Sequence, residues 1–244
     1  MGDYAIVVNT HSSSKDVWPM FFCQLEKHYP NNKVYVFTDD GEGIDQKYNI
    51  ILYNSNDKFR TQYLNSIKQV SENFILYLNE DYILYGDVNV DKVKEYLTIL
   101  RNNSNISFIR FTRGLNFTNI KLTDDLFFGD NKQEYFFSQT AGIWKRESLI
   151  KIHENGPDTH IGVGGSVYGH FEVDANKICR DLNISGLIAY NGEKLRGIHH
   201  YDSDIFPYIA TAIIKGRWNI SEYKEELTKL INEFNINVNL RGVV

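Results

Sequence analysis

The stretch FILYLNED, residues 74–81, joins five consecutive apolar residues to a polar, acidic tripeptide. A continuous apolar run of this length is typical of a strand that is buried on both faces of a sheet. Similar apolar runs occur at residues 4–8, 34–37 and 50–53, and the segment SFIRF at residues 107–111 is expected to be a fifth strand. Segments with helical spacing of apolar residues separate them, which predicts an α/β fold, a Rossmann-type, mostly parallel sheet flanked by helices.

The helices expected between these strands cover residues 16–29, 59–70 and 90–101, where apolar side chains recur every three or four positions. Beyond residue 112 the pattern loosens. The features expected there are a polar excursion at 113–135, a short helix from Arg146, a strand at 187–190 and helices near 205–215 and 221–235. No internal repeat or linker interrupts the chain, so residues 1–244 are expected to form one domain.

Composition excludes several classes of protein. The 244 residues are 42% hydrophobic and carry a net charge of −5, which suits a globular chain and argues against nucleic acid as a partner. Two cysteines are too few for a disulfide framework, and no cysteine–histidine cluster indicates zinc. We find no signal peptide and no apolar run long enough for a transmembrane segment, so a cytoplasmic location is expected.

Polar residues follow three of the predicted strands. Thr10 follows the first, Asp39 the second, and Asn79, Glu80 and Asp81 the fourth. In open α/β sheets ligands bind beyond the carboxyl ends of the strands, so these side chains should share one edge. Two carboxylates near a core are costly unless a positive group meets them, and Mg²⁺ or Mn²⁺ prefers such oxygens. The alternative is an acidic turn that caps the next element.

Glu172 and Asp174 follow a glycine-rich stretch at residues 162–169. In an extended segment both side chains would face the same side, and one carboxylate could take a proton from an acceptor hydroxyl. The alternative is a helix N-terminus, where acidic side chains are favourable.

Histidine and arginine supply the remaining candidates. His199 and His200 could complete the coordination of a metal, or could be ordinary hydrogen-bonding residues. Arg60, in the helix after the third strand, could bind a phosphate or could be a solvated surface residue. Arg196 is a weaker phosphate candidate.

The order and spacing of these motifs, over about residues 3–220, resembles nucleotide-sugar-dependent glycosyltransferases of the GT-A fold. The chain is most similar to small bacterial and large-virus members, on the motif YLNEDY at residues 77–82. The resemblance implies a single GT-A-like domain. Residues 1–112 would bind the nucleotide, residues 113–220 would bind the acceptor, and residues 221–244 would form a C-terminal helix and tail.

The resemblance also implies roles for the acidic motif and its neighbours. Asn79-Glu80-Asp81 stands where the family has Asp-x-Asp, so Asp81 would bind Mn²⁺ or Mg²⁺ and Asn79 would contact the ribose. Asparagine departs from the usual aspartate there, which could cost the metal one ligand. Thr10 and Asp39 would line the nucleoside pocket, and Arg60 would lie near the base or phosphates.

On the acceptor side, Glu172 resembles the acid that serves as catalytic base in inverting members, and Asp174 is the second choice. The glycines at 162–165 resemble the loop near the acceptor. His199 or His200 would take the place of the late histidine that closes the metal site. The segment KGRW at residues 215–218 resembles a closing motif without a clear chemical role.

The implied function is transfer of a sugar from a nucleotide diphosphate donor, UDP by default, to a glycan or lipid-linked acceptor, with inversion. A sugar nucleotidyltransferase is one alternative, although such enzymes usually carry a glycine-rich basic loop after the first strand. Here residues 9–15 are rich in serine and lack glycine. The other alternative is a non-catalytic carbohydrate- or nucleotide-binding protein on a degenerate transferase scaffold, which Asn79 keeps open.

Overall fold

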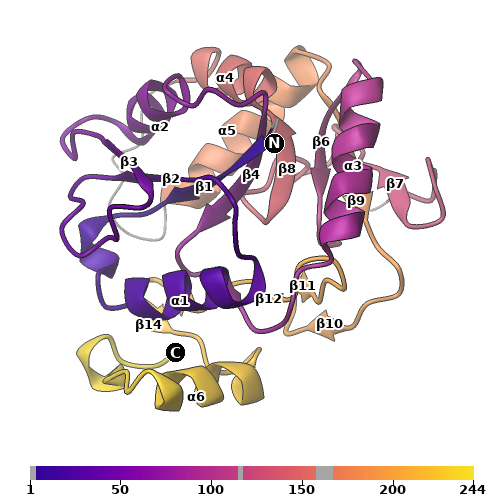
Figure 1. Ribbon diagram of the computed structural model, residues 1–244. Coiled ribbons are helices and arrows are strands. Elements are labelled where there is room, and N and C mark those ends of the chain that lie inside the picture. The colour runs from indigo at the N-terminus through magenta and orange to yellow at the C-terminus, as the bar shows by residue number, and fades with distance from the viewer. Residues whose placement is uncertain (1–3, 115–117, 158–166) are drawn as a thin grey trace.

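The computed structural model describes residues 4–114, 118–157 and 167–244, with the backbone alone at 167–170 (Figure 1). Its centre is an eight-stranded sheet with the order β3-β2-β1-β4-β8-β6-β9-β7. The strands are β1 (Tyr4–Asn9), β2 (Val34–Thr38), β3 (Asn49–Leu52), β4 (Phe74–Asn79), β6 (Ile106–Arg110), β7 (Leu126–Phe128), β8 (Gly142–Lys145) and β9 (Ser185–Ala189). Among these strands β7 and β8 run antiparallel to their neighbours, so the predicted mostly parallel sheet is confirmed.

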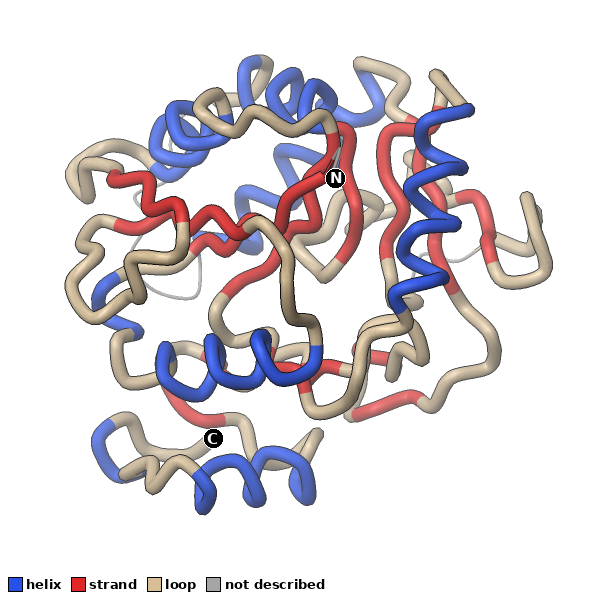
Figure 2. Tube along the Cα trace, in the orientation of Figure 1, coloured by secondary structure: helices blue, strands red, loops and turns tan. Residues whose placement is uncertain are grey.

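Helices cover both faces of the sheet (Figure 2). They are α1 (Trp18–His28), α2 (Phe59–Ile67), α3 (Val90–Asn102), α4 (Arg146–Glu154), α5 (Val167–Asp181) and α6 (Lys224–Glu233). Alternate residues of β1 point to opposite faces: Ile6 and Val8 pack in one buried cluster with α1, α3 and α6. Ala5 and Val7 pack in the other with α2, α4 and α5. Both faces of β1 are therefore buried, as its continuous apolar run predicts.

Two predicted segments are wrong in the later half of the chain. Residues 113–135 are not purely a polar excursion, because β7 lies there and pairs with β9. Residues 205–215 do not form a helix. They contribute β12 (Tyr208–Ile209), which pairs with β5 (Ile83–Leu84), and β13 (Ile213–Ile214), which pairs with β14 (Arg217–Trp218).

The β13–β14 hairpin shows why a helix does not form. Its two connecting residues, Lys215 and Gly216, have φ values of 49° and 77°. Positive φ at both central residues is typical of the tight turn that joins two antiparallel strands and is incompatible with a right-handed helix. A further hairpin joins β10 (Leu195–Arg196) to β11 (His200–Tyr201). These hairpins stand outside the main sheet.

Strand register brings the predicted site residues to one edge. Asn9, the last residue of β1, pairs with Phe37 on β2 and with Asn79 on β4. The residues that follow these parallel strands, among them Thr10, Asp39 and Glu80, therefore leave the sheet at the same end. The shared edge predicted from the sequence is confirmed.

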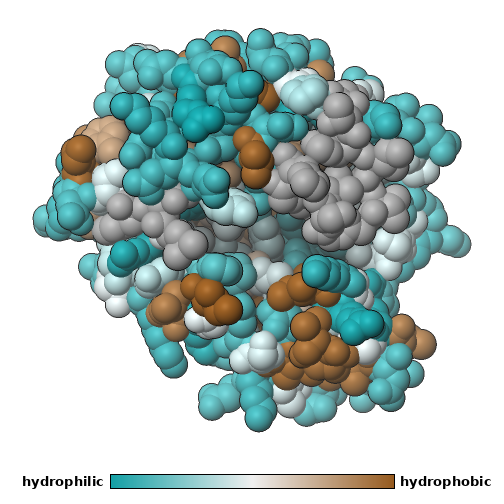
Figure 3. Space-filling view, turned by 180° about the vertical axis from the view of Figure 1, so that it is seen from behind, coloured by the Kyte–Doolittle hydropathy of each residue, from teal (hydrophilic) through white to brown (hydrophobic). Residues whose placement is uncertain are grey.

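The outer surface is mostly hydrophilic on the face seen in Figure 3, where the larger hydrophobic patches lie in the lower half. Ile198 and Leu240 are the most exposed large apolar side chains among the described residues, at 73% and 76%. Within the described ranges we find no helix with the length and apolar character needed to cross a membrane.

Antiparallel β8 lies between β4 and β6, and Gly142 allows the close approach of these backbones. A Cβ atom at Gly142 would lie 2.8 Å from the Ile109 carbonyl oxygen and 3.0 Å from the Arg110 Cα. Both are backbone atoms of β6, so neither can move without shifting the strand.

We therefore expect Gly142→Ala to destabilise the fold by about 1–3 kcal/mol, because it overpacks the centre of the sheet. Gly41→Ala is the matched control, since its added methyl would meet side-chain atoms and no strand backbone, with Ile50 at 3.1 Å and Leu52 at 3.9 Å. Chemical denaturation of both variants measures the difference. Equal losses in the two would contradict the role given to Gly142.

Candidate functional site

A cavity of about 640 Å³ opens at the carboxyl edge of the sheet. Its lining comes from the β1–α1 loop, the acidic turn after β4, the end of β6, residues 138–140, α5, both hairpins near the C-terminus, and Arg241. Segments that are far apart in the sequence therefore meet around one space.

Glu80 and Asp81 form the acidic wall of this cavity. Burial raises the pKa of Glu80, and the hydroxyls of Ser14 and Thr10 and the charge of Arg241 oppose the rise only in part. Burial and the neighbouring Glu80 charge hold the pKa of Asp81 well above its usual value. Two adjacent carboxylates with raised pKa values in a cavity indicate a candidate functional site.

The donor set of this wall fits a hard divalent cation. Mg²⁺ commonly binds through one or two carboxylates and completes its shell with substrate phosphates and water. Glu80 and Asp81 could supply those carboxylates. Within the part of the chain that the structure describes, however, no three histidine, cysteine, aspartate or glutamate side chains gather into a metal-binding group.

The two histidines predicted as metal ligands line the same cavity but are not part of such a group. The Nδ1 atom of His200 lies 2.6 Å from a Glu222 carboxylate oxygen, and its Nε2 atom lies 3.2 Å from the Thr211 hydroxyl. Both nitrogens of His200 are thus engaged. His199 lies in the turn between β10 and β11 and is exposed.

Glu172 lies on α5 and also lines the cavity. The Gln139 N–H donates to its Oε1 at 2.7 Å. Burial raises the pKa of Glu172, while the Gln139 N–H, the Ser138 hydroxyl and the Arg110 charge act in the opposite direction. A carboxylate with a raised pKa at a cavity wall is suited to accept a proton.

The extended conformation considered for residues 172–174 is wrong, because the segment is helical. Its alternative, a helix N-terminus decorated with acids, is also wrong, since α5 begins at Val167. Residues two positions apart on a helix point in different directions, and Asp174 does not line the cavity.

Hydrogen bonds connect the acidic turn after β4 to Glu172. The Tyr77 hydroxyl donates to the Asn79 side chain at 2.7 Å, and the Asn79 amide donates to the Tyr82 hydroxyl at 3.3 Å. Gln139 completes the link. Its side-chain amide donates to Tyr77 at 3.2 Å, its carbonyl accepts from Tyr82, and its N–H meets Glu172. The sequence places Tyr82 in the motif at residues 77–82 but predicts no role for it, and Gln139 was not predicted because it belongs to no motif of recognisable spacing.

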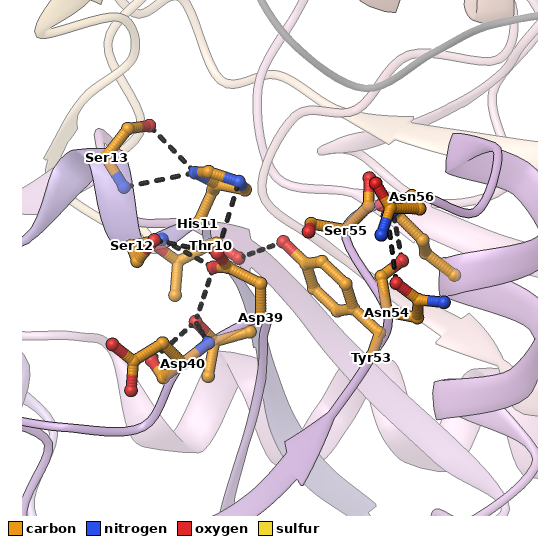
Figure 4. A network of polar contacts seen from close by, with 12 residues as sticks. Thr10, His11, Ser12, Ser13, Asp39, Asp40, Tyr53, Asn54, Ser55 and Asn56 are labelled. Atoms are coloured by element: carbon orange, nitrogen blue, oxygen red, sulfur yellow. Dashed lines mark hydrogen bonds and ion pairs between the residues drawn. The ribbon is translucent and has the colours of Figure 1, made fainter.

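The β1–α1 loop is held by Asp39 (Figure 4). The N–H and hydroxyl of Ser12 both donate to the Asp39 carboxylate at 2.7 Å, and His11 lies 3.3 Å from it. Burial of Asp39 opposes ionisation, but the hydrogen bonds from Ser12 outweigh burial and lower its pKa.

Thr10 is fixed in the same region. Its hydroxyl accepts from the Trp18 indole at 2.8 Å, and its carbonyl accepts from the Tyr53 hydroxyl at 2.7 Å (Figure 4). The cavity is lined here by His11, Ser13 and Ser14, and not by Thr10 or Asp39 themselves. Both residues shape the loop, and their direct contact with a nucleotide stays a prediction.

Arg60 lies away from the cavity lining. It is buried, donates to the carbonyls of Ile152 at 2.7 Å and Pro157 at 3.1 Å, and stacks over the Phe171 ring. Arg196 is bound to the carboxylates of Asp202 and Glu226. The glycines at 162–165 lie outside the described residues.

Three other arginines line the cavity, Arg110, Arg113 and Arg241. Arg241 donates to Asp16 at 2.7 Å and to the Ser13 carbonyl at 2.7 Å, so the C-terminal segment is tied to the β1–α1 loop. Its charge acts on Glu80. No sequence signal distinguishes these arginines from others in the chain, because their position depends on long-range folding.

No protein-family model and no curated protein matches the sequence. Several solved structures are similar at low identity. The bifunctional IspDF from Campylobacter jejuni is 12% identical, with a TM-score of 0.46, over 84% of this chain and 52% of that chain. A cytidylyltransferase from Leptospira borgpetersenii is 14% identical, with a TM-score of 0.48, over 99% and 97%. S. aureus TarS is 15% identical, with a TM-score of 0.49, over 97% and 40%.

The chain therefore spans about half of IspDF, less than half of TarS and nearly all of the Leptospira protein. The function proposed below rests on the residues of the cavity.

The opposite pKa shifts of two aspartates at this edge give a test. Because the raised pKa of Asp81 makes its ionisation unfavourable in the folded state, Asp81→Asn should raise the unfolding temperature at pH 7 without added metal. The gain should shrink as the pH falls toward about 4, where the carboxyl is increasingly protonated in the unfolded chain as well.

Asp39→Asn is the matched control, with the opposite sign. Its lowered pKa means that the ionised form stabilises the fold, so the variant should unfold at a lower temperature at pH 7. Thermal unfolding across this pH range measures both. Destabilisation by Asp81→Asn at pH 7 would contradict the electrostatic account of the acidic wall.

Proposed function

We propose that the protein is a metal-dependent glycosyltransferase of the GT-A type that moves a sugar from a nucleotide diphosphate donor to an acceptor hydroxyl. The observation that carries the proposal is a single cavity with two separate acidic groups. Glu80 and Asp81 follow β4, Glu172 projects from α5, and Gln139 forms hydrogen bonds with Glu172 and with Tyr77 of β4. Transfer of a glycosyl group needs one site for the departing diphosphate and another for the incoming hydroxyl.

On the donor side, Asp81 and Glu80 would hold Mn²⁺ or Mg²⁺. When bound, the cation neutralises the charge that develops on the departing diphosphate. Asn79 would contact the ribose of the nucleotide. Arg241 and Lys215 also line this cavity, and their positive charges would favour a diphosphate there.

On the acceptor side, Glu172 would be the general base. The Gln139 N–H and the Ser138 hydroxyl orient its carboxylate, and burial raises its pKa toward the working range of a base. A base that activates the acceptor oxygen as the diphosphate leaves from the opposite side gives inversion at the anomeric carbon. The acceptor would be a glycan or a lipid-linked sugar, and a UDP-sugar is the first donor to test.

A thermal-shift screen tests the donor site. UDP and other nucleoside diphosphates should raise the unfolding temperature of the full chain, and more so with Mn²⁺ than without it, because a ligand that binds the folded state stabilises it. Asp81→Asn should remove the Mn²⁺-dependent part of the shift. Asp181→Asn, an exposed aspartate at the end of α5, is the control and should keep it.

Three results would overturn this assignment. A shift that is independent of Mn²⁺ in the wild-type protein would exclude the metal role of Asp81. Release of pyrophosphate from a nucleoside triphosphate and a sugar phosphate would make the protein a sugar nucleotidyltransferase. Sugar binding without any nucleotide binding would make it a non-catalytic carbohydrate-binding protein.

Glu172→Gln tests the base. We expect turnover to fall by about 10²- to 10⁴-fold, the usual contribution of general base catalysis, while the nucleotide-dependent thermal shift is retained. Release of the nucleoside diphosphate in the presence of acceptor measures turnover, and Asp181→Asn again serves as the control. A comparable loss in Asp174→Asn with full activity in Glu172→Gln would move the base to the second candidate.

A further inference from the structure

Arg110 is a buried cation at the end of β6 that has an unused hydrogen-bond donor. Its side chain lines the cavity and the residue is only 4% exposed. Nε donates to the Thr112 carbonyl at 3.1 Å and Nη1 to the Tyr135 carbonyl at 3.2 Å. Among the described residues Nη2 has no hydrogen-bond partner, and no carboxylate forms a direct ion pair with this guanidinium, although the charge of Glu172 acts on it. Burial lowers the pKa of Arg110 to about 10, so it stays charged at neutral pH.

Two further polar atoms of the same cavity are buried without a partner, Gln139 Oε1 and Thr140 Oγ1. Buried polar groups in folded proteins are nearly always hydrogen-bonded, so unpartnered groups at a cavity wall indicate a ligand. The amide oxygen of Gln139 can only accept, which calls for a hydroxyl or N–H donor. The guanidinium of Arg110 can only donate, and it prefers an anion.

A second guanidinium lines the same cavity as Arg110. Arg113 lies over the Tyr190 ring at 4.6 Å and over the Tyr201 ring at 5.0 Å, and it also lines the cavity. Space beside Arg110 is kept open by Gly114, where an added Cβ would come within 2.8 Å of Nη2.

Arg110 lies on the Glu172 side of the cavity, and Gln139 lies between Glu172 and the strand that leads to the acidic turn. The charge of Arg110 acts on Glu172 and Tyr208, whereas the cation that acts on Glu80 is Arg241. In the sheet, β6 is separated from β4 by β8, so Arg110 leaves the sheet two strands away from the acidic turn. The cation at Arg110 is therefore placed for a partner other than the donor diphosphate.

We infer that the cavity beside Glu172 binds an acidic saccharide, whose carboxylate or phosphate group is held by Arg110 and whose hydroxyls bond to Gln139 and Thr140. This inference rests on the proposed function, because it makes the acidic saccharide the acceptor. An anion at Nη2 would give this buried guanidinium the direct ion pair that no described carboxylate provides, since Glu172 acts on it only through its charge. A neutral sugar would satisfy Gln139 and Thr140 but could not form an ion pair with Arg110.

Matched sugars test the inference with the full wild-type chain. Glucose, glucuronate and glucose 6-phosphate, and galactose, galacturonate and galactose 6-phosphate, are titrated by saturation-transfer NMR in the presence of UDP and Mn²⁺. In at least one series an acid should bind about 10- to 100-fold more tightly than its neutral sugar, as expected for a charge-assisted hydrogen bond. Preference for the uronate or for the phosphate ester identifies the source of the anion.

Equal affinity for neutral and acidic sugars, or no binding by any of the six, would overturn the inference. Displacement of the acidic sugar by UDP would also overturn it, because the anion would then occupy the donor side. The proposed function fails separately, through the absence of a Mn²⁺-dependent nucleotide shift in the thermal screen.

Variants assign the preference to Arg110. Arg110→Met should abolish the preference for the acid, and Gly114→Ala should weaken it without changing the charge, because the added methyl crowds Nη2. Arg180→Met removes the same charge from the exposed surface of α5 and should leave the preference intact. Full preference in Arg110→Met contradicts the inference. If that variant does not fold, full preference in Gly114→Ala contradicts it instead.

Discussion

Two adjacent carboxylates at the end of a buried strand are the constraint on which the site depends. Glu80 and Asp81 leave β4 directly after five buried residues, and burial together with their mutual repulsion raises the pKa of Asp81. Such an arrangement destabilises the chain in the absence of a cation. Its presence at the mouth of a cavity is therefore better explained by ligand binding than by folding stability.

The rest of the fold holds those carboxylates in place. Parallel pairing of β4 with β1 fixes where the acidic turn begins, and the Ile213 N–H approaches the Asp81 carboxylate from the β13–β14 hairpin. Gln139 connects the turn to Glu172 through hydrogen bonds from both its backbone and its side chain. Gln139 therefore ties the position of Glu172 to β4, the strand that carries the acidic turn.

The sequence predicted the elements that depend on local pattern. The strands β1, β2 and β4 are continuous apolar runs, so their burial, and with it the edge that carries Asp81, could be expected from residue type alone. The same approach wrongly predicted a helix at residues 205–215. Apolar residues of this segment instead pair with β5 and form the β13–β14 hairpin. That pairing depends on a partner more than a hundred residues away, which no local period encodes.

The positions of the arginines likewise depend on long-range folding and could not be predicted from local sequence. Arg60 was expected near the base or phosphates, but it joins α2 to one carbonyl group in the last turn of α4 and one after α4. Arg110 and Arg241 reach the cavity from β6 and from the C-terminal segment. Each lies near a different acidic group, Arg110 near Glu172 and Arg241 near Glu80. This division of charge separates the cavity into two halves. Under the proposed function, one half would take the diphosphate with its cation, and the other would take a second ligand that carries its own negative charge.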